Sequence, residues 1–332
     1  MKVCYVVINL EHYKYFFSDL NPQESLVVLD KKSSALKIAA KKLYRDKNNP
    51  EWIFSLMLFI INRQVKLKNI DVLVVTDLAQ IRFPNGFVRW LKTRYPSLKT
   101  VMMFYNKASA LYGLNGNISI DSISEKDTML PFDKIYTYDP EEAQSFGFEY
   151  YTAISDVSKL VGSVQESPCS DVFYCGSIKH EWKNGRFDAV DQVYQYLNAN
   201  NVKCDFHLVI SKDLQLPERE YVGTSRLPYL DVIKRSISSK AILEIVSDGQ
   251  NGVTERFYDA LMYNRKFITN NSSVLHHPYY NSKYMKVFEK PSDIDIKWLL
   301  NDETVEYNYD GKYTPKGMYK MLEKMWNNQR YN

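Results

Sequence analysis

Short apolar segments alternate with amphipathic ones along almost the whole chain, and this alternation predicts strands separated by helices. In the first half, apolar runs predict strands at 2–8, 25–29, 71–75, 100–105 and 134–138. Between them, hydrophobic spacing typical of helices covers 33–44, 51–63, 87–95 and 140–146. Strands rich in Val, Ile and Tyr that alternate with helices indicate βαβ units and a parallel sheet. We therefore expect a doubly wound α/β domain over residues 1–160.

The same alternation resumes after a polar stretch at 155–170, which we interpret as a linker. Strands are predicted at 171–176, 204–210, 241–246, 266–269 and 285–288, and helices at 186–198, 229–236 and 254–263. This pattern predicts a second α/β domain over 171–312, followed by a closing segment, 313–332, with a helix at 315–328. The predicted fold class is therefore α/β, with two Rossmann-like doubly wound domains that face a central cleft.

Composition and charge narrow the class of protein. The chain has 332 residues, more than one hydrophobic core usually serves, which favours two domains. With 45% hydrophobic and 25% charged residues, disorder is excluded as the dominant state. The formal net charge of +4 suits an anionic ligand or an anionic membrane surface. It gives no reason to expect nucleic acid as a partner.

Cysteine usage and hydropathy predict a cytoplasmic protein. None of the four cysteines has CxxC spacing, and their scatter is typical of a reduced compartment. The longest apolar run, 52–61, is about half of the roughly 20 residues that span a bilayer. The stretch 31–47 is basic and amphipathic, so we expect a peripheral contact with anionic lipid at the inner face of the cytoplasmic membrane. The alternative is a solvated helix face.

The segment 241–271 carries the most informative chemistry. A buried strand is predicted to run into a loop with Gly249 and Gly252, and a helix begins near Thr254. Ligands of parallel α/β sheets bind beyond the carboxyl ends of strands, glycines let the backbone approach them, and a helix N-terminus attracts anions. These features together predict an anion-binding site.

Two charged residues on the predicted helix agree with such a site. Arg256 lies in the first turn, where a cation is unfavourable for the helix unless an anion such as a diphosphate is nearby. Asp259 is at i+3 from Arg256 and shares its face, where a carboxylate can accept hydrogen bonds from ribose hydroxyls. The alternative is an ion pair of Arg256 with Asp259 or Glu255 on the protein surface.

This segment resembles the nucleotide-binding motif of GT-B glycosyltransferases, especially those of bacterial capsule and lipopolysaccharide gene clusters. The shared features are the Gly-containing loop, Arg256, the acid-Ala-Leu step at 259–261 and the strand at 267–269. The strand at 171–177 is similar to the opening strand of the same domain. The resemblance covers roughly 171–300 and implies a nucleotide-diphosphate-sugar donor, with Arg256 at the diphosphate and Asp259 at the ribose.

One position departs from the family. Many retaining members have a Glu eight residues before the ribose-binding acid, and here that position is Asn251. Glu244 lies in an apolar strand, where an unpaired carboxylate is costly, so it either binds substrate or caps a backbone amide. The expected donor-binding residues are Gly176, Lys179, Glu244, Gln250, Asn251, Gly252, Thr254, Arg256 and Asp259.

The first domain is expected to bind the acceptor and to supply the catalytic base. A general base must reach the acceptor hydroxyl, so acids and histidines that follow predicted strands are the candidates. Glu11 and His12 follow the first strand, and Asp77 follows the third. A helix-capping or loop role is the alternative for each of them.

No metal or further cofactor is expected. His276 and His277 are adjacent, and Asp293 and Asp295 precede a helix near the C-terminus, away from any donor site. No P-loop, GxSxG or GxGxxG motif is present, which disfavours a kinase, a hydrolase or a nicotinamide enzyme. We predict a metal-independent glycosyltransferase of the hexosyltransferase type, which transfers a sugar to a glycan or lipid-linked acceptor in surface polysaccharide biosynthesis. The alternatives are a pyruvyl-type transferase and a non-catalytic nucleotide- or glycan-binding protein.

Overall fold

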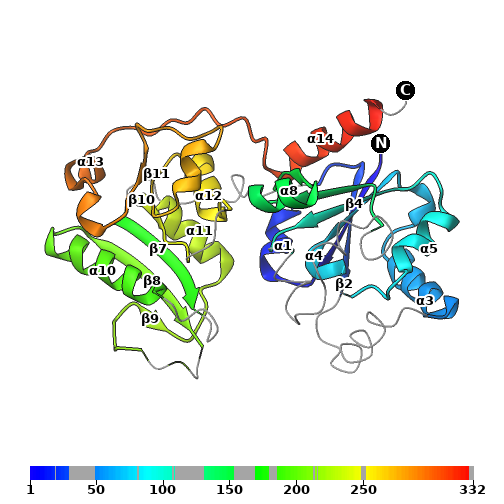
Figure 1. Ribbon diagram of the computed structural model, residues 1–332, viewed down its shortest axis with the longest axis horizontal. Coiled ribbons are helices and arrows are strands. Elements are labelled where there is room, and N and C mark those ends of the chain that lie inside the picture. Colours follow the sequence, from blue (N-terminus) through cyan, green and yellow to red (C-terminus); the bar gives the residue numbers. More distant parts are fainter. Residues whose placement is uncertain are drawn as a thin grey trace. The chain divides into compact units, whose positions relative to one another are not determined.

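The chain forms two compact units in the computed structural model (Figure 1). Unit 1 comprises Met1–Ser155 and Lys312–Asn332, and unit 2 comprises Asp156–Gly311. The structure describes residues 1–18, 20–29, 49–80, 82–106, 108, 131–152, 169–178, 185–211, 214, 216–247 and 252–328. The helix predicted at 33–44 and the linker predicted at 155–170, except for its last two residues, lie outside this part.

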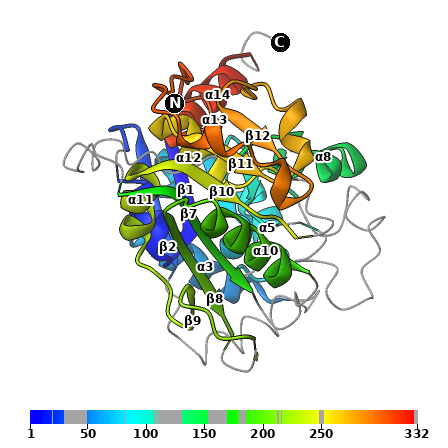
Figure 2. The same ribbon diagram turned by 90° about the vertical axis from the view of Figure 1, so that its left-hand side faces the viewer.

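Unit 2 contains a six-stranded parallel sheet in the order β12-β11-β10-β7-β8-β9. Its strands are β7 (Ser170–Ile178), β8 (Cys204–Ile210), β9 (Val222–Gly223), β10 (Ser239–Glu244), β11 (Lys266–Thr269) and β12 (Met285–Val287). The helices are α10 (Arg186–Ala199), α11 (Tyr229–Ile237), α12 (Glu255–Tyr263) and α13 (Ile296–Leu300), with 3-10 turns at Ser272–His276 and Pro291–Asp293. Figure 2 shows this unit from the side on which α10 covers β7 and β8. The strand order reverses between β7 and β10, which is the Rossmann arrangement.

Unit 1 also contains a six-stranded parallel sheet, in the order β2-β1-β3-β4-β5-β6. Its strands are β1 (Val3–Ile8), β2 (Glu24–Leu29), β3 (Val72–Thr76), β4 (Lys99–Phe104), β5 (Lys134–Thr137) and β6 (Glu149–Tyr150). The helices are α1 (Glu11–Phe16), α3 (Glu51–Asn62), α4 (Asp77–Gln80), α5 (Phe87–Arg94), α8 (Pro140–Phe146) and α14 (Pro315–Asn328), with a 3-10 turn at Leu67–Asn69.

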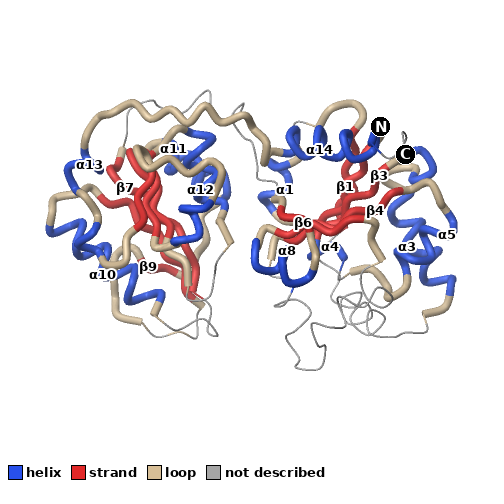
Figure 3. Tube along the Cα trace, turned by 45° about the horizontal axis from the view of Figure 1, so that its top comes forward, coloured by secondary structure: helices blue, strands red, loops and turns tan. Residues whose placement is uncertain are grey.

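Helices lie on both sides of each sheet (Figure 3). Strands covered on both faces have no polar side, and all residues of β1 and of β3 are buried. This is why continuous apolar runs located them in the sequence. The predicted fold class, α/β with two Rossmann-like doubly wound domains, is therefore confirmed.

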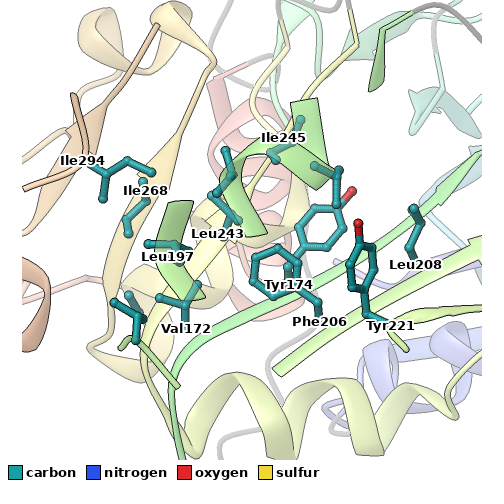
Figure 4. Close-up of a cluster of buried hydrophobic side chains, with 14 of the residues drawn as sticks. Val172, Tyr174, Leu197, Phe206, Leu208, Tyr221, Leu243, Ile245, Ile268 and Ile294 are labelled. Atoms are coloured by element: carbon teal, nitrogen blue, oxygen red, sulfur yellow. The ribbon is translucent and has the colours of Figure 1, made fainter. Parts of the chain in front are cut away.

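The core of unit 2 lies between the sheet and α10 (Figure 4). Val172 and Tyr174 of β7 and Leu243 of β10 belong to one buried cluster with Leu197 of α10. The rings of Tyr174 and Phe206 have centroids 5.3 Å apart. Close packing of these side chains holds β7, β10 and α10 against one another.

Two strands of unit 2 differ by two residues from their predicted bounds, and β12 ends one residue early, at Val287. β7 continues past 176, because residues 176–178 pair with 208–210 of β8. β10 covers Ser239–Glu244 instead of 241–246, and its last residue pairs with Thr269, the last residue of β11. Beyond the strand, the amide N–H of Val246 donates to the side-chain oxygen of Asn270 at 2.8 Å.

Candidate functional site

The candidate site lies at the carboxyl ends of β7 and β10, which flank the point where the strand order of unit 2 reverses. Ligands of open α/β sheets bind at this edge. Gly176 is in the last part of β7, Glu244 is the final residue of β10, and the chain then leads to α12. The expected residues Lys179, Gln250 and Asn251 lie outside the described part of the chain.

Helix α12 begins next to Thr254, as the sequence predicts. Thr254 is the N-cap residue, with an extended backbone, and its hydroxyl oxygen accepts the amide N–H of Arg256 at 3.2 Å. The same hydroxyl donates to the carboxylate of Glu244. The hydroxyl of Thr254 therefore links the capped start of α12 to the end of β10, the strand at the switch point.

Glu244 holds three elements together. Its side chain is buried, and its two carboxylate oxygens accept hydrogen bonds from the hydroxyls of Thr254 and of Thr269, the latter at 2.6 Å. Burial raises the pKa of Glu244, and these hydrogen bonds oppose the rise. The carboxyl group thus joins the ends of β10 and β11 to the cap of α12, which makes it a positioning residue for the site.

Two asparagines after β11 anchor the ends of the loop between β10 and α12. The side-chain amide of Asn270 pairs with both backbone groups of Val246, at 2.8 and 3.2 Å. The buried Asn271 donates to the carbonyl of Gly252 at 3.2 Å. Sequence reasoning gave neither residue a role. The sequence does show two asparagines directly after a predicted strand. Side-chain amides at such a position can form hydrogen bonds with the backbone N–H and C=O groups of a neighbouring loop.

Arg256 and Asp259 form an ion pair in which Asp259 is buried and Arg256 is partly exposed. The Nη1 atom of Arg256 lies 2.9 Å from Oδ2 of Asp259, and the two side chains are 14% and 1% exposed. The ion pair that the sequence offered as the alternative is therefore present, with its acid Asp259 inside the protein rather than on the surface. Glu255 approaches the same guanidinium at 3.5 Å and is about half exposed.

The pair leaves hydrogen-bonding capacity unused. Among the described residues, three atoms of the pair have no hydrogen-bond partner with good geometry. They are the two carboxylate oxygens of Asp259 and the Nη1 atom of Arg256. Burial raises the pKa of Asp259 to about 7, an effect that Arg256 reduces without cancelling it. A buried carboxyl group and a partly exposed guanidinium with free capacity in the first turns of a helix can hold a ligand that is both anionic and rich in hydroxyls.

Positive charge acts on the carboxyl half of β7. Burial raises the pKa of Cys175, and Arg256, Arg235 and Arg226 act against this rise, whereas Asp205, the ion-pair partner of Arg235, adds to it. Arg186, the first residue of α10, approaches the carbonyl of Ser177 at 3.4 Å. This environment favours a ligand with negative charge.

Gly176 is required by its neighbour on the same face of β7. A Cβ atom at this position would lie 2.3 Å from the hydroxyl oxygen of Tyr174, closer than atoms can approach. Tyr174 is itself buried in the core cluster, so its ring has little room to move. The glycine therefore lets the tyrosine lie along the end of the strand.

The three candidates in unit 1 lie at neighbouring strand ends. Asp77 opens α4 directly after β3, and Glu11 and His12 form the first turn of α1 after β1, which pairs with β3. Glu11 is exposed and His12 is half-buried, with its ring 4.3 Å from that of Tyr13. Their catalytic roles stay predictions.

Asp77 is buried and heavily hydrogen-bonded. One carboxylate oxygen accepts the amide N–H of Leu78 at 2.7 Å. The other accepts the amide N–H of Tyr105 at 3.2 Å and two N–H groups of Asn106 at 2.9 Å. Burial raises the pKa of Asp77, and these bonds oppose the rise. These contacts tie the end of β3 to the end of β4.

Neither a cluster of metal ligands nor a membrane-spanning helix is found among the described residues. Within the described ranges, no three His, Cys, Asp or Glu side chains gather as metal ligands do. Asp293 accepts backbone N–H groups of residues 289 and 290, and Asp295 caps α13. Metal independence stays a prediction. Of the helices in the described part, none is both long and apolar enough to cross a bilayer.

The two-unit architecture is that of the GT-B fold, so the resemblance noted in the sequence is confirmed at the level of the fold. No protein-family model matches the chain, and no curated protein matches it either. Among solved structures, S. aureus MnaA with UDP is 11% identical, with a TM-score of 0.50 over 98% of this chain and 97% of that one.

Two further solved structures match this chain over most of their length. UDP-GlcNAc 2-epimerase from Neisseria meningitidis, bound to UDP-GlcNAc, is 9% identical, with a TM-score of 0.48 over 97% of this chain and 100% of that one. The lipopolysaccharide outer core galactosyltransferase WaaB is 11% identical, with a TM-score of 0.42 over 88% of each chain. At such identities the similarity establishes a fold and no particular reaction.

Proposed function

We propose that this protein is a glycosyltransferase that binds a nucleotide-diphosphate sugar at the carboxyl edge of the unit 2 sheet. The observation that carries the proposal is the start of α12. There, a capped helix N-terminus near the switch point presents the partly exposed Arg256 and the buried Asp259 on one face, both with unused hydrogen-bonding capacity. A diphosphate and a ribose are the chemical groups that such a pair suits.

In this proposal each group has one task. Arg256 contacts the diphosphate and stabilises the charge that develops on it as the bond from the anomeric carbon to the phosphate oxygen breaks. Asp259 accepts hydrogen bonds from the ribose hydroxyls. Glu244 touches no substrate and holds the cap of α12 in place.

The acceptor reaction completes the transfer. An acceptor hydroxyl attacks the anomeric carbon, and its proton passes to a base of unit 1, for which Glu11, His12 and Asp77 are the candidates. Of these, Asp77 already accepts four N–H groups, so Glu11 and His12 have the more accessible side chains. We propose a glycan or lipid-linked acceptor of surface polysaccharide biosynthesis, with no metal required.

A thermal-shift screen tests the donor site. Wild type is measured with UDP, GDP, CMP, dTDP and their sugars, because a ligand that binds only the native state raises the melting temperature. UDP comes first, since the S. aureus neighbour was solved with it. We expect a shift with one nucleotide diphosphate that is lost in Arg256→Ala.

A matched control separates binding from general damage. Arg219→Ala removes another guanidinium of unit 2 that is paired with an aspartate, Asp191, at 2.6 Å. This variant should keep the full ligand-induced shift even if its own melting temperature falls. Equal shifts in wild type and Arg256→Ala would overturn the site. A shift without transfer to any acceptor would favour the non-catalytic reading, and no shift with any nucleotide would favour the pyruvyl-type one.

A further inference from the structure

One face of α3 in unit 1 is apolar and open to solvent. Trp52, Leu56 and Phe59 have relative exposures of 67%, 47% and 60%. Their spacing is i, i+4 and i+7, so they fall within about 60° of one another around the helix. Large apolar side chains that gather in this way on a surface mark a binding site more often than single ones do.

The opposite face of the same helix fixes its orientation. Ile53, Phe54, Leu58 and Ile61 are buried. The ring of Phe54 packs against Phe87 and Trp90 of α5, with centroids 6.3 and 5.7 Å away. Figure 1 shows α3 beside α5 in unit 1. The helix cannot rotate to bury Trp52 and Phe59 without exposing this packed face.

The charged residues of α3 and of the segment that follows it are almost all positive. Arg63, the C-cap residue, keeps helical backbone angles and so continues the same stripe at i+11 from Trp52. Lys66 and Lys68 follow it and are exposed. Over residues 51–70 the only acid is Glu51.

We propose that this face, defined by Trp52, Leu56, Phe59 and Arg63, docks the protein onto an anionic lipid bilayer. Tryptophan and phenylalanine enter the boundary between headgroups and acyl chains, while the cations meet lipid phosphates. This occupant is favoured because positive charge around an apolar stripe complements a negative surface. The inference rests on unit 1 alone and is independent of the donor site proposed in unit 2.

Vesicle sedimentation tests the proposal on the full chain. Binding is measured to vesicles of phosphatidylcholine alone and of phosphatidylcholine mixed equally with phosphatidylglycerol. We expect binding to the mixed vesicles that weakens with added salt. Trp52→Ser with Phe59→Ser should lower the partition coefficient at least about tenfold. Lys66→Gln and Lys68→Gln should each lower it about fivefold.

The matched control is Leu275→Ser, which removes an exposed leucine (46% exposed) of unit 2 and should leave vesicle binding unchanged. Melting temperatures show that each variant folds. Equal binding by wild type and the double serine variant would overturn the proposal, as would no binding to either vesicle. Concentration-dependent dimerisation that the same two substitutions abolish would identify a second copy as the occupant and overturn it too. A nucleotide-induced thermal shift that persists in the serine variant keeps this test separate from the donor site.

Discussion

The substitution Asp259→Asn tests the energetics of the ion pair at the start of α12. Asp259 is buried, its pKa is raised from 3.8 to about 7, and burial is the main cause. Glu255 contributes to the rise, and Arg256 opposes it. The folded protein therefore holds this proton more tightly than the unfolded chain does. Asn keeps the size of the side chain but cannot ionise.

The direction of the pH effect follows from this raised pKa. The stability contributed by the protonated carboxyl is fully present below about pH 4 and is lost as the pH rises through about 7. At about 1.4 kcal/mol for each pKa unit, wild type should lose about 3 kcal/mol relative to Asp259→Asn between pH 5 and pH 8. The variant lacks this loss because its amide stays neutral.

Urea unfolding followed by circular dichroism at several pH values measures the effect. The quantity of interest is the free energy of unfolding of the variant minus that of wild type, because unit 1 is the same in both proteins and cancels. We expect this difference to rise between pH 5 and pH 8. If the pair instead acted as a net stabilising salt bridge, the pKa of Asp259 would lie below 3.8 in the folded protein and the difference would stay constant between pH 5 and pH 8. That result would refute the reasoning from burial.

An aspartate with the opposite environment provides the control. Burial also acts to raise the pKa of Asp133, but hydrogen bonds from Lys92 and Thr100 outweigh it and hold that pKa below its ordinary value. Its stabilising effect is therefore lost as the pH falls. Asp133→Asn should give a difference of the opposite sign, with wild type gaining on the variant as the pH rises from acid to neutral.

Two further substitutions test contacts inside the units, one in unit 2 and one in unit 1. The Nζ atom of Lys266 donates to the carbonyls of residues 298, 299 and 301 at 2.6 to 3.1 Å, which caps the C-terminus of α13. Lys266→Met should lower the free energy of unfolding by about 2–3 kcal/mol in urea, and an unchanged midpoint would contradict this role. Asp77→Asn replaces an acceptor with a donor that faces the N–H groups of Tyr105 and Asn106, so it should destabilise unit 1 by about 2 kcal/mol and leave nucleotide binding intact. Wild-type stability together with lost transfer would instead assign Asp77 a catalytic role.

The sequence determined the order and most of the bounds of the elements. β8, β11, α8 and α14 begin and end where the apolar pattern predicts. Parallel strands covered by helices on both faces are continuous apolar runs, which are easy to see. Thr254 indicated the start of α12, because a hydroxyl at the N-cap position accepts a backbone N–H that has no partner within the helix. The two-residue strands β6 and β9 escaped notice because they are too short to show a pattern.

The tertiary structure decided the environment of each functional group. Nothing near Glu244 in the sequence indicates that Thr254 and Thr269, ten and 25 residues away, take up its two oxygens. The spacing of Arg256 and Asp259 predicted their shared face, but the burial of Asp259, and with it the raised pKa of its carboxyl, depends on the packing of unit 2. The run 52–61 is apolar on nearly every side, so only packing against α5 shows that Trp52 and Phe59 face solvent. Local pattern encodes which element forms, whereas burial and charge state depend on contacts between residues that are distant in the chain.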